Sequence, residues 1–273
     1  MIARVRGGMV KTEREHRQDI VDIGRLVYQK GWVAANDGNI TIRLDHDRIL
    51  STPTGVSKGM MHVDDLIIVD NEGNKLEGRL EKTSEILMHL VIYNMRADVH
   101  AIVHAHPPVS TGFAAAGLSL NKALLPEVVI GLGCVPLAEY GLPGTPELSE
   151  RMRPLIPKFD AILLANHGAV AYGADIRKAF FRMETVEHFA RINLVAQMLG
   201  GPKLLSGADV QKLVESRGRY GFASAATAEA GCPIVAEQAA PGQAAADGQE
   251  RFTVTRDELV ELVEEAIRVR ENG

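Results

Sequence analysis

Short apolar segments joined by short connections are the feature that most restricts what this chain can fold into. We predict strands at residues 39–44, 48–51, 66–69, 101–103, 161–165 and 169–172. Several of the connections are too short for the crossover of a dozen or more residues that joins parallel strands. The sequence therefore predicts a mixed or largely antiparallel sheet.

Amphipathic stretches between these segments supply the predicted helices. Apolar residues recur at helical spacing in residues 12–30, 83–95 and 175–199, and Asp175 is the expected N-cap of the last of these helices. Residues 146–157 are a further predicted helix. Because helices and strands are interspersed along the chain, we expect helices on both faces of the sheet.

The composition divides the chain into three predicted parts. Residues 1–222 carry these strands and helices and form the predicted main domain. Residues 223–250 are rich in alanine, glycine and glutamine, which predicts a flexible linker. Residues 251–273 contain a predicted C-terminal amphipathic helix, in which Thr255 and Glu258 have capping-box spacing. The apolar stripe of this helix consists of Leu259, Leu262, Val263, Ala266 and Ile267.

The bulk composition excludes several classes of protein. With 273 residues and 46% hydrophobic composition, the chain can bury one sizeable core. Its net charge of −5 gives no basic surplus for binding nucleic acid or an anionic membrane. The sequence has no run of 18 apolar residues, and its first residues lack the apolar core of a signal peptide. We therefore expect a cytoplasmic protein that binds neither nucleic acid nor membrane.

Three histidines have the arrangement of a catalytic metal site. His104 and His106 follow a short apolar strand, and in an extended segment residues i and i+2 point the same way. Both imidazoles can then reach one ion, and Pro107 and Pro108 stop the strand directly afterwards. His167 lies at the end of another apolar strand. Three histidines with an open fourth position are typical of catalytic zinc.

Small polar residues beside glycine, or at a helix start, predict a phosphate site. The amino end of a helix offers free backbone N–H groups and the positive end of the dipole, and glycine permits close backbone approach. Each such segment alone is more often a turn or a cap. The segments are Asn36-Asp37-Gly38-Asn39, Thr52-Pro53-Thr54-Gly55 and Lys82-Thr83-Ser84-Glu85.

At these positions the chain resembles the class II aldolase/adducin family, with the L-fuculose-phosphate aldolases as the nearest members. The resemblance extends from about residue 14 to residue 222. The matching segments are Asp37-Gly38-Asn39-Ile40, Thr52-Pro53-Thr54-Gly55, Thr83-Ser84-Glu85, His104-Ala105-His106, Asn166-His167-Gly168 and Arg219-Tyr220-Gly221. These motifs occur in the order of the family, which makes the resemblance specific.

The resemblance implies a three-layer α/β/α sandwich around a mainly antiparallel sheet. It also implies a homotetramer whose active sites lie between neighbouring subunits. In that arrangement Glu85 is the catalytic acid/base, and Tyr220 is a proton donor contributed by a neighbouring subunit. The implied cofactor is Zn²⁺, held by His104, His106 and His167. The implied ligands of the substrate phosphate are Asn39, Thr54, Gly55, Thr83 and Ser84.

The reaction implied by the resemblance is zinc-dependent retro-aldol cleavage of a ketose 1-phosphate, such as L-fuculose 1-phosphate. Its products are dihydroxyacetone phosphate and a small aldehyde. Pentulose-5-phosphate 4-epimerases share the fold but carry aspartate where this chain has Glu85. Decarboxylases of phosphorylated sugar acids keep the glutamate and stay an alternative. Non-enzymatic adducin-like modules lack the metal histidines, whereas this chain has all three.

Two departures and the C-terminal tail complete the expectations. Fuculose-phosphate aldolases commonly carry a tyrosine near Pro126-Glu127, and Lys82 replaces a small residue beside the phosphate pair. These departures concern the aldehyde half of the substrate more than the phosphate half, and the roles of Glu127 and Lys82 stay open. The linker and terminal helix resemble the encapsulation peptides of bacterial microcompartment enzymes, which makes shell proteins a predicted partner. Docking of the helix on its own tetramer is the alternative.

Overall fold

The computed structural model describes residues 11–220. The predicted linker, residues 223–250, and the predicted C-terminal helix, residues 251–273, lie outside the described residues. The strands are β1 Asn39–Arg43, β2 Ile49–Ser51, β3 Ile67–Val69, β4 Lys75–Glu77, β5 Ala101–Ala105, β6 Leu137–Ala138, β7 Ala161–Leu164 and β8 Gly168–Gly173. The helices are α1 Glu13–Gln29, η1 Val63–Asp65, α2 Ile86–Met95, α3 Pro108–Ala115, α4 Pro126–Gly131, α5 Pro146–Met152, α6 Ile176–Met198, α7 Gly207–Ser216 and η2 Arg217–Tyr220.

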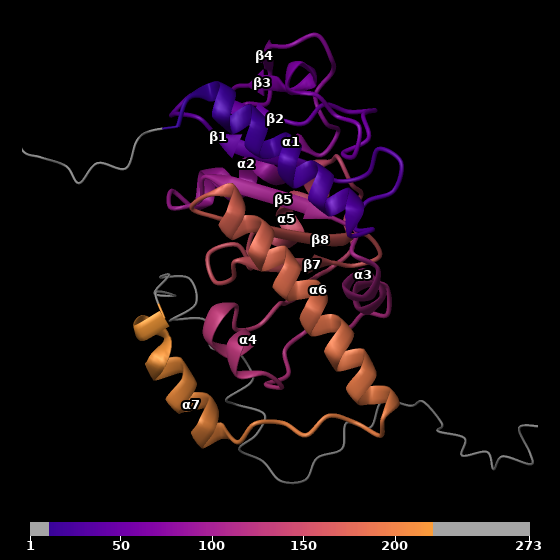
Figure 1. Ribbon diagram of the computed structural model, residues 1–273, viewed down its shortest axis with the longest axis vertical. Helices are drawn as coiled ribbons and strands as arrows, with labels where there is room; N and C mark the ends of the chain where they lie inside the picture. Colours follow the sequence, from indigo (N-terminus) through magenta and orange to yellow (C-terminus); the bar gives the residue numbers. More distant parts are fainter. Residues whose placement is uncertain (1–10, 221–273) are drawn as a thin grey trace, which may run out of the picture. The chain divides into compact units, whose positions relative to one another are not determined.

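One sheet organises the described part of the chain (Figure 1). The strand order is β4-β3-β2-β1-β5-β8-β7-β6. Neighbouring strands are antiparallel except β6 and β7, which are parallel. The prediction of a mainly antiparallel sheet is therefore confirmed. Strands β5 and β8 pair from Ala101 with Gly173 to Ala105 with Ala169.

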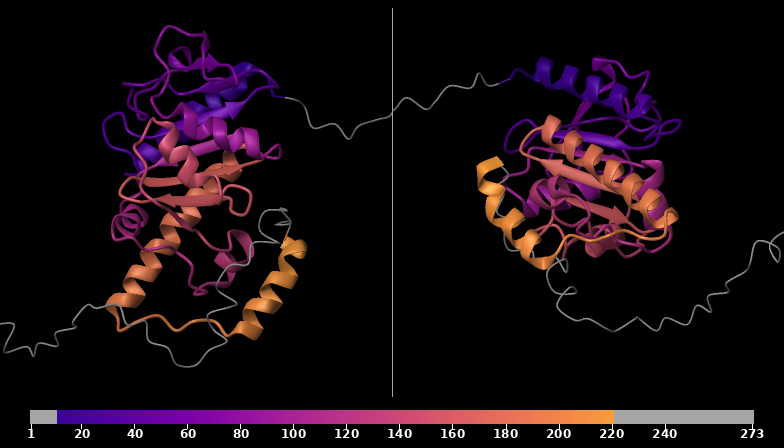
Figure 2. Two further views of the ribbon diagram at one scale, coloured as in Figure 1. Left: turned by 180° about the vertical axis from the view of Figure 1, so that it is seen from behind. Right: turned by 60° about the horizontal axis from the view of Figure 1, so that its bottom comes forward.

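Helices cover both faces of the sheet, which confirms the three-layer α/β/α sandwich. Alternate strand residues point to opposite faces. In β5, Ala101, Val103 and Ala105 join the core beneath α1, α3 and α6, whereas Ile102 joins the core beneath α2 and α5. Figure 1 shows α1 and α6 across the near face, and the reverse view in Figure 2 exposes the face that α2 and α5 cover.

Local chemistry explains where the main helices begin. Thr12 and Glu15 form a capping box at the start of α1, and the side chain of Asp175 accepts a hydrogen bond from the backbone N–H of Lys178, as predicted for α6. Helix α3 was not predicted, because Pro107 and Pro108 were interpreted only as the end of a strand. Pro108 instead occupies the first position of a helix, where its missing N–H costs nothing.

Within residues 11–220, no helix has both the length and the apolar character needed to cross a bilayer.

A buried acidic residue just before β7 forms ion pairs with two arginines. Asp160 is 1% exposed, and its two carboxylate oxygens lie 2.8 Å from Arg96 Nη2 and 2.5 Å from Arg182 Nη2. Arg96 also pairs with Asp98 at 2.7 Å. Arg96 comes from the end of α2 and Arg182 from α6, so Asp160 joins helices from opposite faces of the sheet.

Asp160→Ala is expected to lower the free energy of unfolding by about 3–5 kcal/mol, because it removes the counter-charge that Arg182 shares with the buried Arg96 and leaves Arg96 with its pair to the more exposed Asp98. Urea unfolding followed by circular dichroism measures the change. The control is Glu150→Ala, which removes a pair with Arg153 whose side chains are largely exposed. That substitution is expected to cost about 0–1 kcal/mol. Equal effects of the two substitutions would show that the Asp160 cluster contributes no more than a surface pair.

Candidate metal and catalytic site

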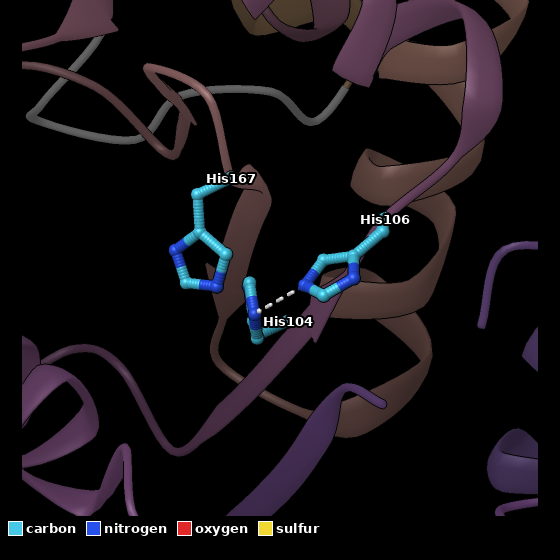
Figure 3. A group of neighbouring side chains, drawn as sticks. All are labelled: His104, His106 and His167. Atoms are coloured by element: carbon cyan, nitrogen blue, oxygen red, sulfur yellow. Dashed lines mark hydrogen bonds between the residues drawn. The ribbon is translucent and has the colours of Figure 1, made fainter. Parts of the chain in front are cut away.

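Antiparallel pairing brings the three histidines together from distant parts of the sequence. Because β5 and β8 run in opposite directions, the end of β5 lies beside the start of β8. His104 is the fourth residue of β5, and His167 directly precedes β8. His106 follows β5 by one residue, with its backbone N–H bonded to the carbonyl of Trp32 at 2.8 Å. The three rings face one another (Figure 3).

The Asn-His-Gly sequence suits the tight turn between β7 and β8. Asn166 has φ +55°, a left-handed conformation that asparagine adopts more readily than most residues. Gly168 leaves room for the neighbouring ring, because a Cβ there would lie 2.5 Å from His106 Cδ2 and 2.7 Å from the Ala105 carbonyl oxygen. Only glycine permits this approach. The turn therefore places His167 against the other two histidines.

The geometry of the three imidazoles fits one metal ion. His104 Nε2 and His106 Nε2 are 3.2 Å apart, and the ligand atoms of the three histidines all lie within 4.8 Å of one another. Two nitrogen ligands of a tetrahedral zinc, each at 2.0–2.1 Å, are separated by roughly 3.3 Å. His104 Nδ1 lies 2.9 Å from the Ala169 carbonyl oxygen, so Nδ1 carries the proton and Nε2 keeps its lone pair for a metal.

The protonation state of His106 and its contact with Asp37 also suit a metal site. Burial, together with the neighbouring His104 and His167, lowers the pKa of His106 to about 4, so its ring is neutral at pH 7. His106 Nδ1 faces the Asp37 carboxylate at 3.5 Å, a contact that orients the ring. A metal requires neutral imidazoles, and the lowered pKa of His106 meets this requirement.

Glu85 lies against the histidines at the start of α2. Its Oε2 is 3.3 Å from His104 Nε2, and its Oε1 is 3.1 Å from His167 Nε2. Oε1 is buried without a hydrogen bond among the described residues. Burial raises the pKa of Glu85, but the contacts with His104 and His167 outweigh it and hold the pKa below its usual range. Glu85 is therefore a carboxylate that can accept a proton.

Four of the five predicted phosphate residues lie on two adjacent turns. Pro53 and Lys82 form an antiparallel bridge, and the backbone N–H of Thr54 donates to the Glu81 carbonyl at 3.0 Å. These contacts place Thr54-Gly55 beside Thr83-Ser84, just before α2. Gly55 has φ +74°, and a Cβ there would meet nothing within 4 Å. Thr54, Gly55 and Ser84 are exposed, and Thr83 is 5% exposed.

Asn39, the fifth predicted phosphate residue, is engaged elsewhere. It is 3% exposed, and its Nδ2 donates to Glu85 Oε2 at 2.8 Å. Its Oδ1 lies 2.5 Å from His89 Nε2. The side chain thus contacts the predicted catalytic residue, and its role at the phosphate stays a prediction.

The remaining predicted residues lie in separate surroundings. Tyr220 ends η2 and is 63% exposed. Lys82 donates from Nζ to the Gly73 carbonyl at 2.6 Å, which directs its charge toward the turn after β3. Glu127 lies in the first turn of α4 and lines a cavity of about 1310 Å³ together with residues of α6 such as Lys178 and Arg182.

Lys58 is a site neighbour that the sequence did not reveal. It is 1% exposed, and its Nζ donates to the carbonyls of Asn36 at 3.0 Å and Val56 at 3.1 Å. Burial lowers its pKa to about 8, while Asp37 and Glu85 act to raise it. One buried cation therefore joins the segment before Gly38 to the segment after Gly55. No local pattern distinguishes this lysine from a surface one.

Comparison with known proteins places these residues in one family of sequences. Residues 18–194 match the family described as Class II Aldolase and Adducin N-terminal domain. A 3-oxo-tetronate 4-phosphate decarboxylase of Haemophilus influenzae is 33% identical, covering 76% of this chain and 100% of that protein. An L-fuculose phosphate aldolase of Methanococcus maripaludis is 35% identical, covering 66% of this chain and 97% of that protein.

A solved structure gives the same similarity in three dimensions. An L-fuculose 1-phosphate aldolase superposes with a TM-score of 0.71 at 28% sequence identity. The superposition covers 79% of this chain and 100% of that one.

Proposed function

The chain belongs to the class II aldolase and adducin family, and from that premise we propose that this lyase breaks a carbon–carbon bond in a small phosphorylated keto sugar. Cleavage leaves the enediolate of dihydroxyacetone phosphate. The observation that carries the proposal is the position of Glu85, 3.3 Å from His104 and 3.1 Å from His167, beside two turns suited to phosphate.

The chemistry divides between the metal and the side chains of the chain. Zinc held by His104, His106 and His167 supplies a Lewis acid that stabilises negative charge on the substrate oxygens. Glu85 returns a proton to the carbon that has lost its bond, and takes that proton away in the reverse direction. Its buried position keeps bulk water from competing for this transfer.

The phosphate is assigned to the two adjacent turns before α2. Thr54, Thr83 and Ser84 carry hydroxyl groups there, Gly55 permits close backbone approach, and the amino end of α2 adds the positive end of its dipole. Binding energy from the phosphate, which does not react, holds the ketone beside Glu85. Glu85 occupies the N-cap position of α2, so one helix start serves both phosphate binding and proton transfer.

Retro-aldol cleavage of a ketose 1-phosphate is the first candidate reaction. The bond between C3 and the hydroxyl-bearing C4 breaks. Its electrons form the enediolate with the ketone, and the half that contains C4 departs as an aldehyde. The C4 hydroxyl must lose its proton as the aldehyde forms, and regain it in the reverse direction. We assign this proton transfer to Tyr220 of a neighbouring subunit in a homotetramer. Its 63% exposure within one chain leaves it accessible to a second copy.

Decarboxylation of a 3-oxo-tetronate 4-phosphate is the second candidate. It is supported by the similarity to the 3-oxo-tetronate 4-phosphate decarboxylase, 100% of which is covered by the match. In such a substrate the carboxylate lies two carbons from the ketone. Loss of carbon dioxide leaves the same enediolate, and one proton on carbon again yields dihydroxyacetone phosphate. The two reactions differ in the group that departs but share the enediolate, so Glu85 and the phosphate turns serve both.

A substrate panel tests the proposal. Purified, metal-loaded enzyme is mixed with ketose 1-phosphates (fuculose, rhamnulose, ribulose and 5-deoxyribulose) and with 3-oxo-tetronate 4-phosphate. Dihydroxyacetone phosphate, aldehyde and carbon dioxide are then measured separately. Aldehyde in equal amount to dihydroxyacetone phosphate identifies the first reaction, and carbon dioxide in equal amount identifies the second. Chelation is expected to stop either one. Metal-loaded enzyme that releases no dihydroxyacetone phosphate from the panel would refute the proposal.

Ser84→Asp is expected to raise KM for the phosphorylated substrate at least about tenfold, because a carboxylate would take the place assigned to the phosphate and repel it. Steady-state kinetics measure the change. The control is Ser206→Asp, which adds the same charge at the N-cap of α7 and keeps the capping oxygen. Equal KM values for the two variants would remove Ser84 from the phosphate site.

A further inference from the structure

A ladder of buried polar side chains connects Glu85 to the interior of the protein. Three residues of α2 and its cap, Glu85, His89 and Tyr93, recur every four positions and form one stripe of the helix. On the facing strand β1, Asn39 and Thr41 alternate with Ile40 and Ile42, so their side chains point toward that stripe. All five residues are at least nine-tenths buried.

Hydrogen bonds join these side chains in one unbranched series. Tyr93 OH lies 2.9 Å from Thr41 Oγ1, which lies 2.8 Å from His89 Nδ1. His89 Nε2 lies 2.5 Å from Asn39 Oδ1, and Asn39 Nδ2 lies 2.8 Å from Glu85 Oε2. The series ends at the carboxylate that faces His104 and His167.

The chemistry of the last member fixes the direction of every bond. A carboxylate only accepts hydrogen bonds, so Asn39 must turn its NH₂ group toward Glu85 and its carbonyl toward His89. His89 must then donate from Nε2–H, which leaves Nδ1 as an acceptor for the Thr41 hydroxyl. Thr41 in turn accepts from Tyr93. Burial lowers the pKa of His89 to about 3, so the ring is neutral and this single tautomer is available.

The series separates the roles of the two oxygens of Glu85. Oε2 is held by Asn39, whereas Oε1 is buried without a hydrogen bond among the described residues. A buried acceptor left unsatisfied is costly, and such an atom calls for an explanation. A ladder that served stability alone would satisfy both oxygens. Here Asn39 anchors one oxygen, whereas the other faces His167 Nε2 at 3.1 Å, on the side of the metal histidines.

We propose that His89 and Asn39 are positioning residues, which anchor Glu85 through Oε2 and leave Oε1 as the oxygen that carries the proton to and from substrate carbon. This inference rests on the proposed function. It assigns the Asn39 side chain a contact with the carboxylate that orients it. It also gives His89, four residues after Glu85, an indirect role through Asn39 rather than a direct contact with Glu85.

Two amide substitutions at position 89 separate the two nitrogens of the ring. In His89→Gln the side-chain NH₂ reaches about as far as Nε2 and can still donate to Asn39. In His89→Asn the shorter amide reaches only the place of Nδ1, so Asn39 loses its partner. We expect His89→Asn to lower kcat about 10- to 100-fold with KM changed less than about twofold, because a misplaced carboxylate affects the proton transfer and not phosphate binding.

The test measures kcat, KM and metal content for wild type, His89→Gln and His89→Asn, with product release assayed on the best substrate of the panel. His89→Gln is expected to restore kcat to within about threefold of wild type. Asn39→Ala, which removes the donor to Glu85 directly, serves if His89→Asn does not fold, and the same loss of kcat is expected.

The outcomes distinguish this inference from the function on which it rests. An inactive wild type would refute the proposed function and this inference with it. An active wild type with equal kcat for His89→Gln and His89→Asn would overturn the inference alone. So would a change confined to KM or to metal content, because anchoring Glu85 predicts neither.

Discussion

Replacing His104 with alanine is expected to remove the bound metal and carbon–carbon cleavage together. His104 is 1% exposed, its Nε2 lies 3.2 Å from His106 Nε2, and its Nδ1 is oriented by the Ala169 carbonyl. Loss of this ligand leaves two histidines for an ion whose catalytic sites generally use three protein ligands. We expect turnover to fall at least about 10³-fold, since the remaining groups cannot stabilise the enediolate.

Metal content after gel filtration and turnover on the same samples measure this effect. His100→Ala is the matched control, because it removes an exposed imidazole just before the same strand. It is expected to keep both metal and activity. Circular dichroism checks that His104→Ala is folded, since the Ala169 carbonyl loses its partner. A metal-free His104→Ala enzyme with near-normal turnover would contradict the assigned metal role.

Glu85→Gln is expected to keep the metal but lower turnover by about 10²- to 10⁴-fold, the usual contribution of a general acid–base group. Glutamine has nearly the same shape, and its carbonyl oxygen can still accept the hydrogen bond from Asn39. It cannot take up a proton. Because the three proposed metal ligands are all histidines, the substitution is expected to leave metal binding unchanged.

Metal content and steady-state kinetics of Glu85→Gln separate the loss of chemistry from the loss of the ion. Glu81→Gln is its control, because Glu81 is an exposed carboxylate four residues earlier that pairs with Lys75. If Glu85→Gln turned over at the rate of Glu81→Gln, another group would have to move the proton. Loss of metal in Glu85→Gln would instead make Glu85 part of the metal site.

Local patterns predicted much of the fold because they depend on neighbouring residues. The capping role of Asp175 and the apolar segments that became β5, β7 and β8 were recognisable from the sequence. Strand β4 was missed because all three of its residues are exposed and give no apolar signal. Helices α4 and α7 were also missed, because α4 has only six residues and α7 buries only Val210.

The sequence predicted those parts of the candidate site that depend on the spacing of neighbouring residues. It did not predict the parts that depend on contacts between segments far apart in the sequence. His104 and His106 share an extended segment, so their convergence followed from the sequence, whereas His167 depends on the register between β5 and β8. The contact of Asn39 with His89 joins residues 50 positions apart and depends on which stripe of α2 faces β1. The buried position of Lys58 likewise depends on two loops that meet only in the folded chain.

Exchange of hydrogen on dihydroxyacetone phosphate in D₂O tests the central claim most directly. It needs neither the aldehyde nor the carboxylate, only Glu85, the phosphate turns and the metal site. Proton NMR is expected to show metal-dependent deuteration of the hydroxymethyl carbon by wild type, none after chelation and none by Glu85→Gln. Metal-loaded wild type that leaves this carbon fully protonated would contradict the account, because no enediolate would then form at the site.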